Sequence, residues 1–325
     1  MSRALDSRVK EALENGNHEE VYREISMVLG RRYDKPLEIE FLGHSHHMSS
    51  PTSLLQEDNA IAIPKLQLIR AFIVARQKLQ AYPADILNGS AQEALEATAV
   101  ILLMDAEHLT AANTRKRILE AQVAANSQEA GEFVSREKYF IDSLLTSRLH
   151  RHTKSPNLWS HRRWLLDRFK ALDIPLDVPA DLRNVVFVSG ERHPRNYYGW
   201  CHARYLIILT ELDPDVLSTI LEDTKKWCFT HHNDISGWMF LLFVLDRSKN
   251  RTMGIFGETI KLVESFHWRN ESVWYFLRNV VLSESMGGEI PEDFFRVLET
   301  FRKGADGDFR RILDKTAVWV EDHSS

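Results

Sequence analysis

The chain has 325 residues, of which 44% are hydrophobic and 27% charged, and this composition is typical of a globular protein with one or two domains. Its formal net charge of -5 gives no general attraction for nucleic acid or acidic membrane surfaces, so any anion binding must come from a local basic cluster. The two cysteines, Cys201 and Cys228, form no Cys-x-x-Cys pair, which excludes a disulfide framework and a zinc knuckle.

The first residues lack the apolar core of a secretory signal, and no apolar stretch approaches the roughly 18 residues that span a bilayer. The use of cysteine fits a reducing compartment. We therefore expect a cytoplasmic protein with no transmembrane segment and no nucleic-acid partner.

Residues 30–60 show no regular hydrophobic period, because turn residues such as Pro36, Gly43 and Pro51 interrupt it. No alternating strand pattern longer than about five residues is evident. We expect an extended N-terminal arm here. The histidines of this region, His44, His46 and His47, lack a carboxylate or cysteine at ligand spacing, so a solvated loop explains them better than a metal site.

Helical periodicity dominates the rest of the chain. An amphipathic helix is predicted over residues 64–82, with its apolar stripe at Leu66, Ile69, Phe72, Ile73 and Leu79. Asp213-Pro214 predicts a helix start, an N-cap followed by proline. A later helix is predicted from Pro291, after Gly287-Gly288 has ended its predecessor.

Four tryptophans begin similar segments and reveal a repeat. They are Trp159, Trp200, Trp238 and Trp274, spaced by 200 - 159 = 41, 238 - 200 = 38 and 274 - 238 = 36 residues, the length of a two-helix unit. An earlier segment has the same frame with Ala112 in the tryptophan position. Arginine three or four residues after the tryptophan lies on the same helix face, so we expect buried indoles and guanidiniums that bond a neighbouring unit.

The predicted fold is therefore all-α, a right-handed superhelix of helical hairpins. We divide the chain into an N-terminal arm with lead helices, residues 1–90, and a repeat solenoid with C-terminal helices, residues 91–325.

The recurring Trp-x-x-Arg-Arg-x-x-Leu pattern, preceded by Ser155-Pro156 or Asn196-Tyr197, resembles the α-subunit repeat of protein prenyltransferases. The similarity runs from about Ile101 to Leu282. It is greatest to the repeat-containing branch of that family, which includes the α-type subunit of the third type of geranylgeranyltransferase. A tetratricopeptide array would instead show a 34-residue period.

This resemblance implies an α-type subunit that is inactive without a separate β-type subunit. The β-type subunit would hold the zinc ion and the prenyl diphosphate pocket, and this chain would bind no cofactor or metal itself. The family's lysine five positions before the second repeat's tryptophan corresponds to Lys154, which implies a catalytic role at the leaving diphosphate. Asn157, Arg195 and Tyr197 are the corresponding substrate-binding candidates in the shared site. The implied reaction is prenyl transfer, of a geranylgeranyl or farnesyl group, to protein cysteine thiols.

Departures from the family pattern leave a second function open. Pro156 replaces a tyrosine, and Ala203 and Leu241 replace repeat arginines. Lys154 is equally explained by a solvated basic turn with His150 and Arg151. The alternative is a non-catalytic helical scaffold for protein–protein interaction. Motifs for nucleotide binding, serine hydrolysis and zinc proteolysis are absent, so a stand-alone enzyme is not expected.

Overall fold

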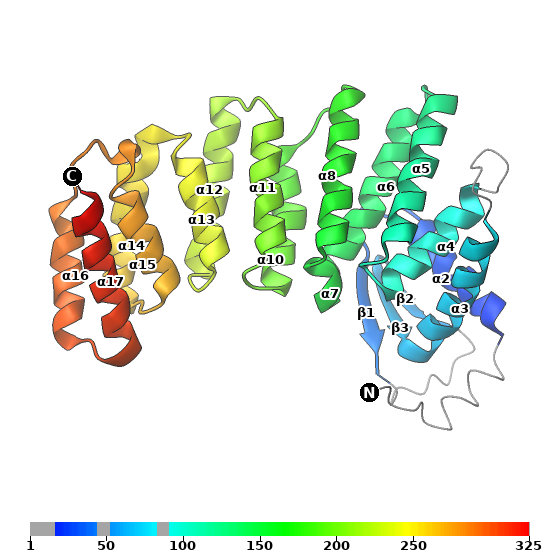
Figure 1. The fold of residues 1–325 in the computed structure, drawn as a ribbon, viewed down its shortest axis with the longest axis horizontal. Coiled ribbons are helices and arrows are strands. Elements are labelled where there is room, and N and C mark those ends of the chain that lie inside the picture. The colour runs from blue at the N-terminus through cyan, green and yellow to red at the C-terminus, as the bar shows by residue number, and fades with distance from the viewer. Residues whose placement is uncertain (1–16, 44–52, 83–90, 325) are drawn as a thin grey trace. The chain divides into compact units, whose positions relative to one another are not determined.

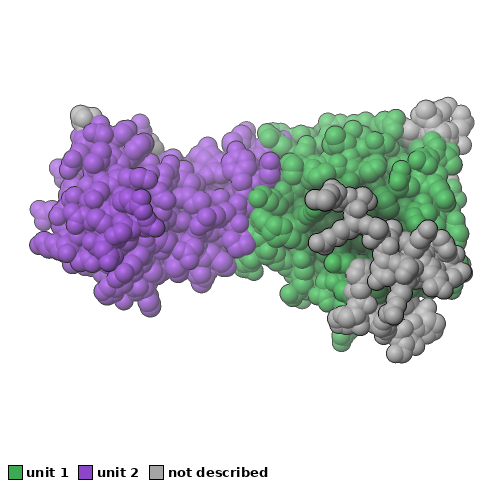
Figure 2. Space-filling model, turned by 60° about the horizontal axis from the view of Figure 1, so that its bottom comes forward, with its two compact units in different colours: residues 1–176, 191–193 green, residues 177–190, 194–325 purple. Residues whose placement is uncertain are grey.

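The computed structural model describes residues 17–43, 53–82 and 91–324. Helices dominate these residues, which confirms the predicted all-α helical repeat fold (Figure 1). The chain divides into two compact units, one of residues 1–176 with 191–193 and the other of residues 177–190 with 194–325 (Figure 2). The division predicted at residue 90 stays a prediction.

The first unit combines helices with a small sheet. Its helices are α2 (His18–Gly30), α3 (Lys65–Ala81), α4 (Ala91–Met104), α5 (Leu109–Ala125), α6 (Ala130–Leu145), α7 (His150–Thr153) and α8 (Pro156–Ala171). Its strands are β1 (Glu38–Leu42), β2 (Leu55–Glu57) and β3 (Ala60–Pro64), in the order β1-β3-β2. Helices α2, α3 and α4 pack on one another, and α6 packs on α8.

The sheet replaces part of the expected extended arm. β1 pairs in parallel with β3, placing Ile39 beside Ile61, and one face of the two strands is buried. The backbone N–H of Arg148, after α6, donates to the carbonyl of Ile39 at 3.1 Å, so the sheet is fixed to the helical part. The three histidines considered as a metal site lie outside the described residues.

Helix α3 confirms the predicted helix at residues 64–82, but it buries a different face. The buried side chains are Leu68, Ala71, Val74 and Ala75, while the predicted stripe is half-buried. Small residues face inward because α3 packs closely against both α2 and α4.

The second unit is a run of helices with short helical turns between them. Its helices are α9 (Val178–Asp181), a π-helical turn (Leu182–Phe187), α10 (Val188–Arg192), α11 (Tyr197–Leu209), α12 (Pro214–Thr230), α13 (Ile235–Leu245), α14 (Thr252–Phe266), α15 (Glu271–Val280), α16 (Glu292–Gly304) and α17 (Gly307–His323), with 3-10 turns at Lys249–Arg251 and Glu284–Met286. Only residues 188–190 of α10 belong to this unit. The predicted starts at Asp213-Pro214 and Pro291 are confirmed.

Every repeat begins in the same way. The N-cap residue lies four positions before the tryptophan position, and in four repeats its side chain accepts a hydrogen bond from a backbone N–H of the first turn. These four N-caps are His108, Ser155, Asn196 and Asp234. The N-cap therefore starts each of these helices at the same distance before its tryptophan position.

The predicted burial of all four tryptophans is confirmed. Trp159 is 3% exposed and the other three are 1% exposed or less. Three of the indoles donate their Nε1–H to the carbonyl six residues upstream, at 2.9 to 3.1 Å, which closes the turn before the helix. The fourth indole, of Trp200, has no acceptor among the described residues and packs edge-on against Trp227.

Candidate functional site

In the first two repeats, the residue three positions after the tryptophan position forms a buried ion pair. In the first repeat, Arg115 forms a bidentate pair with Glu137, with N–O distances of 2.8 and 2.6 Å. In the second, Arg162 donates its Nε–H to Asp142 at 2.6 Å. Both carboxylates come from α6, which follows Arg115 within its own two-helix unit and belongs to the unit before that of Arg162. The expectation that a repeat arginine bonds a neighbouring unit is therefore confirmed for Arg162.

Apolar residues take the same position in the later repeats. Ala203, Leu241 and Leu277 are each 0% exposed. A buried charge needs a partner, whereas a buried methyl or isobutyl group needs only packing. The position is therefore a core position in all five repeats, and its arginines are structural.

Burial and neighbouring charges shift the pKa values of Glu137, on α6, and of His161, which lies beside it. Burial by itself raises the pKa of Glu137, but the charge and hydrogen bonds of Arg115, together with the nearby His161, outweigh it and lower the pKa to about 2. Burial lowers the pKa of His161, whose Nε2 lies 3.2 Å from Oε1 of Glu137. The carboxylate stays ionised and the imidazole neutral near pH 7.

Lys154 lies at an exposed turn between α7 and α8. It is the C-cap of α7, and Ser155 caps the next helix, with Pro156 in its first turn. Within the described residues, its ammonium takes part in no ion pair. The lysine is therefore available to solvent or to a ligand.

The basic residues before Lys154 do not all face outward. His150 and Arg151 are exposed, but His152 is buried, with its Nε2 2.9 Å from the carbonyl of Leu102. Burial lowers the pKa of His152, so this imidazole adds no positive charge at pH 7. Local positive potential at the turn comes from Lys154 and Arg151.

Asn157 is half-buried and already has a partner inside the protein. Its side-chain amide donates to the carbonyl of Ala106 at 2.9 Å, and Ser155 donates to the same carbonyl at 3.3 Å. These bonds tie the start of α8 to the segment before α5. The predicted contact of Asn157 with a substrate stays a prediction.

Arg195 and Tyr197 share the turn that begins α11. Arg195 has a left-handed backbone, with φ of 61°, and its N–H donates to the Asp234 carboxylate at 2.6 Å. Tyr197 is 63% exposed, and hydrogen bonding with the Cys201 thiol raises the pKa of its phenol. Asp234, which caps α13 and holds this turn, could be recognised in the sequence only as an N-cap.

Other features of the described residues bear on chemistry. No group of three histidine, cysteine, aspartate or glutamate side chains there is arranged to hold a metal ion. Cys201 and Cys228 are free thiols. Among these residues, no helix has both the length and the apolarity to cross a membrane.

Comparison with known proteins extends the resemblance seen in the repeats. Residues 158–266 match the family model described as the ECM9 middle domain. The protein prenyltransferase alpha subunit repeat-containing protein 1 of Homo sapiens is 26% identical over 179 residues, which are 50% of this chain and 42% of that protein. About half of the chain is thus similar to protein prenyltransferase alpha subunit repeat-containing proteins. The predicted family resemblance is thereby confirmed.

Two further relatives show how far the match extends. Protein prenyltransferase alpha subunit repeat-containing protein 1-B of Xenopus laevis is 26% identical over 188 residues, covering 52% of this chain and 40% of that protein. Protein ECM9 of Saccharomyces cerevisiae is 28% identical over 171 residues, covering 52% of this chain and 44% of that protein. The match thus spans well under half the length of each relative.

Proposed function

We propose that this chain is the α-type subunit of a heterodimeric protein prenyltransferase and acts with a separate β-type subunit in geranylgeranyl transfer to protein cysteine thiols. The observation that carries this proposal is the repeat frame, which places Lys154 at an exposed turn five residues before the buried Trp159. The names of the relatives agree with this class of function.

The proposed role of Lys154 follows from the chemistry of the leaving group. When the bond from carbon to the diphosphate oxygen breaks, negative charge grows on the diphosphate. An ammonium on a flexible four-carbon chain can follow that charge from the rim of a partner's pocket. The zinc ion that activates the thiol would belong to the β-type subunit, so this chain would contribute charge and shape alone.

The surface of α11 supports a partner on the same side as Tyr197. Tyr197 and Ile208 are 63% and 66% exposed, and a spacing of 11 residues puts them on one face of the helix, three turns apart. Exposed apolar residues along one face are typical of a surface that a protein partner covers. In this proposal, Arg195 and Tyr197 extend the substrate-binding side of the shared site.

A non-catalytic scaffold is the second candidate, and one observation favours it. Ala203, Leu241 and Leu277 show that the repeats keep their core without the family's arginines, so the fold persists without the full motif. A scaffold would use the same exposed helix face to bind a protein, with no need for Lys154.

Co-expression with candidate β-type subunits tests the proposal. We expect a stable one-to-one complex that buries roughly 2,000 Å² or more of surface and transfers a prenyl group to a cysteine-containing acceptor protein. Failure to form a complex with any β-type subunit would overturn the proposal. A stable complex that binds prenyl diphosphate but transfers nothing would favour the scaffold.

A further inference from the structure

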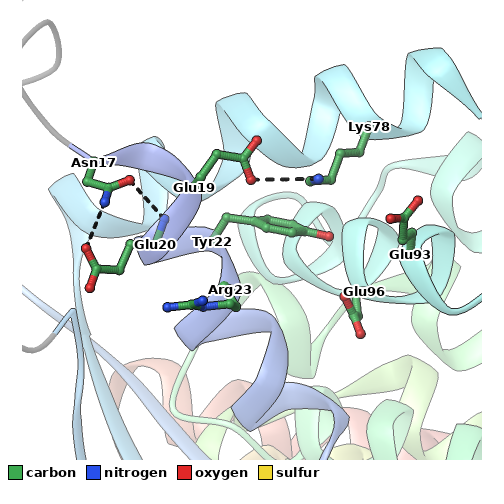
Figure 3. Close-up of a pocket in the computed structure, with 8 residues that line it drawn as sticks. All are labelled: Asn17, Glu19, Glu20, Tyr22, Arg23, Lys78, Glu93 and Glu96. Atoms are coloured by element: carbon green, nitrogen blue, oxygen red, sulfur yellow. Dashed lines mark hydrogen bonds and ion pairs between the residues drawn. The ribbon is translucent and has the colours of Figure 1, made fainter.

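A cavity of about 510 Å³ lies on the first unit, where α2, α3 and α4 meet, away from the turn of Lys154 (Figure 3). Carboxylates predominate in its lining. Glu19 and Glu20 come from α2, and Glu93 and Glu96 come from α4. Arg23 and Lys78 are its cationic residues. Neither the repeats nor the prenyltransferase resemblance accounts for this cavity.

The carboxylates of the cavity are unequally neutralised. Glu19 pairs with Lys78 at 3.7 Å, and Glu20 accepts a hydrogen bond from the Asn17 amide at 2.8 Å. Glu96 accepts only a neutral hydrogen bond, from the Gln92 amide at 2.8 Å, and pairs with no cation in the described part of the chain. Negative charge therefore remains at Glu96, on the α4 side of the cavity.

Tyr22 supplies an independent sign that the cavity is a binding site. Its side chain is 4% exposed, and its hydroxyl has no hydrogen-bond partner among the described residues. Figure 3 shows this hydroxyl directed between the side chains of Glu93 and Glu96. A buried hydroxyl without a partner costs free energy, and such groups in proteins are usually satisfied.

The phenol of Tyr22 remains protonated, so it is a donor as well as an acceptor. Burial raises its pKa, and the nearby carboxylates of Glu96, Glu19 and Glu93 raise it further. Lys78 lies with its Nζ 5.3 Å from the centre of the Tyr22 ring. The cavity therefore contains an uncharged hydroxyl group between the carboxylates of Glu93 and Glu96.

We infer that this cavity binds the guanidinium of an arginine side chain presented by a partner protein. Glu93 and Glu96 stand three residues apart on α4, so their side chains are neighbours on one helix face. A planar guanidinium has five N–H donors and can bond the Glu96 carboxylate with two of them while leaving another donor for the phenol oxygen. A compact ammonium offers three donors and no such fork.

The probe is the peptide acetyl-Gly-Arg-Gly-amide, titrated into the full chain and followed by nuclear magnetic resonance. The neutral isostere with citrulline in place of arginine is the ligand control. We expect the arginine peptide to bind with saturable shifts at α2 and α4, and the citrulline peptide to bind at least tenfold more weakly. Charge-assisted hydrogen bonds of this kind are lost when the guanidinium is neutralised.

Variants locate the binding. Glu96→Gln should lower the affinity for the arginine peptide by about tenfold or more, because a charge-assisted hydrogen bond becomes a neutral one. Tyr22→Phe should lower the affinity for the same peptide by a few-fold and leave the circular dichroism spectrum unchanged. The matched control is Glu132→Gln on α6, an exposed carboxylate already paired with Arg136 at 2.7 Å, which should leave binding unchanged.

Three results would overturn the inference. Equal binding of the citrulline peptide would show that charge is not recognised. Unchanged binding in Glu96→Gln would place the ligand elsewhere. Tighter binding of spermidine than of the arginine peptide, with the same loss in Glu96→Gln, would assign the cavity to a free polyamine.

Discussion

At the scale of single residues, Gly237 shows how closely the aromatic core is packed. A Cβ added at this position would lie 2.4 Å from a ring carbon of Trp227, closer than any real contact. A Cβ added at Gly257, in α14, would have no atom within 4 Å of it. The two glycines are therefore a matched pair, one required by packing and one not.

We predict that Gly237→Ala lowers the free energy of unfolding by about 1–3 kcal/mol, the usual cost of overpacking a core. Gly257→Ala should be neutral or stabilise by up to about 1 kcal/mol, because alanine favours helix more than glycine does. Chemical denaturation monitored by tryptophan fluorescence measures both. Equal effects of the two substitutions would contradict the observed packing of Trp227 on α13.

Lys154 is the residue on which the proposed chemistry depends. We predict that Lys154→Ala leaves folding and binding of the β-type subunit nearly intact, because an exposed lysine contributes little to stability. The single-turnover rate of prenyl transfer should fall by roughly tenfold to a thousandfold, the effect of removing one group that stabilises developing charge.

The matched control for Lys154 is Lys303→Ala, an exposed lysine near the end of α16. It should leave the rate unchanged. An unchanged rate with Lys154→Ala in an active heterodimer would reduce this lysine to a solvated turn residue. The repeat fold would be unaffected by that result.

At the scale of helices, the pair of Arg162 and Asp142 joins α8 to α6 where later repeats use apolar contacts. We predict that Arg162→Leu lowers the free energy of unfolding by about 3–5 kcal/mol, since it leaves a buried carboxylate whose remaining cationic partner among the described residues is Lys138. The second change, Asp142→Leu, should then recover at least half of that loss.

This recovery is expected because Leu241 and Leu277 already fill the equivalent positions without any charge. Urea denaturation of both single variants and the double variant gives the coupling energy. Simple additivity of the two losses would show that the ion pair is not what couples these helices.

Helix starts and buried tryptophans could be predicted from the sequence because their causes are local. An N-cap such as Asp234 acts on the N–H groups two and three residues later, and an indole in a regular frame has a fixed position on its helix. The buried face of α3 could not be predicted, because it depends on which helices lie on either side. The sheet was missed because its strands have three to five residues and pair across a gap in sequence.

At the scale of the whole molecule, the sequence predicted the repeat fold but only part of the candidate site. Lys154 was expected to be exposed and is, because a lysine that follows a short helix and precedes a capped proline turn has no core to enter. The engagement of Asn157 with Ala106 could not be predicted, since the two are 51 residues apart. The cavity at Tyr22 likewise needs three helices to be placed together.

The stability of the first unit should depend on pH through His152. Burial lowers the pKa of this histidine in the folded state below its ordinary value of 6.5. Below that value the unfolded chain binds a proton that the folded chain does not, so the free energy of unfolding falls as the pH falls. At pH above 6.5 both states are neutral at this residue, and it adds no pH dependence.

We therefore predict that the free energy of unfolding decreases from pH 7 to pH 5.5, with a contribution from His152 of up to about 1.4 kcal/mol per pH unit, the value for one proton. His161 should add to the same slope, because burial lowers its pKa too. Glu137 affects the free energy of unfolding in a different, lower pH range. Its folded pKa of about 2 makes its contribution fall only below its ordinary value of 4.5.

His152→Gln tests the assignment, since glutamine can still donate to the Leu102 carbonyl but does not titrate. Between pH 7 and pH 5.5, the free energy of unfolding of this variant should change less with pH than that of the wild type. The control is His150→Gln, the same substitution at an exposed histidine two residues earlier on α7, which measures the effect of the substitution itself. Denaturation curves for the three proteins at each pH decide the matter, because a slope that is unchanged in His152→Gln would mean that this imidazole is protonated equally in both states.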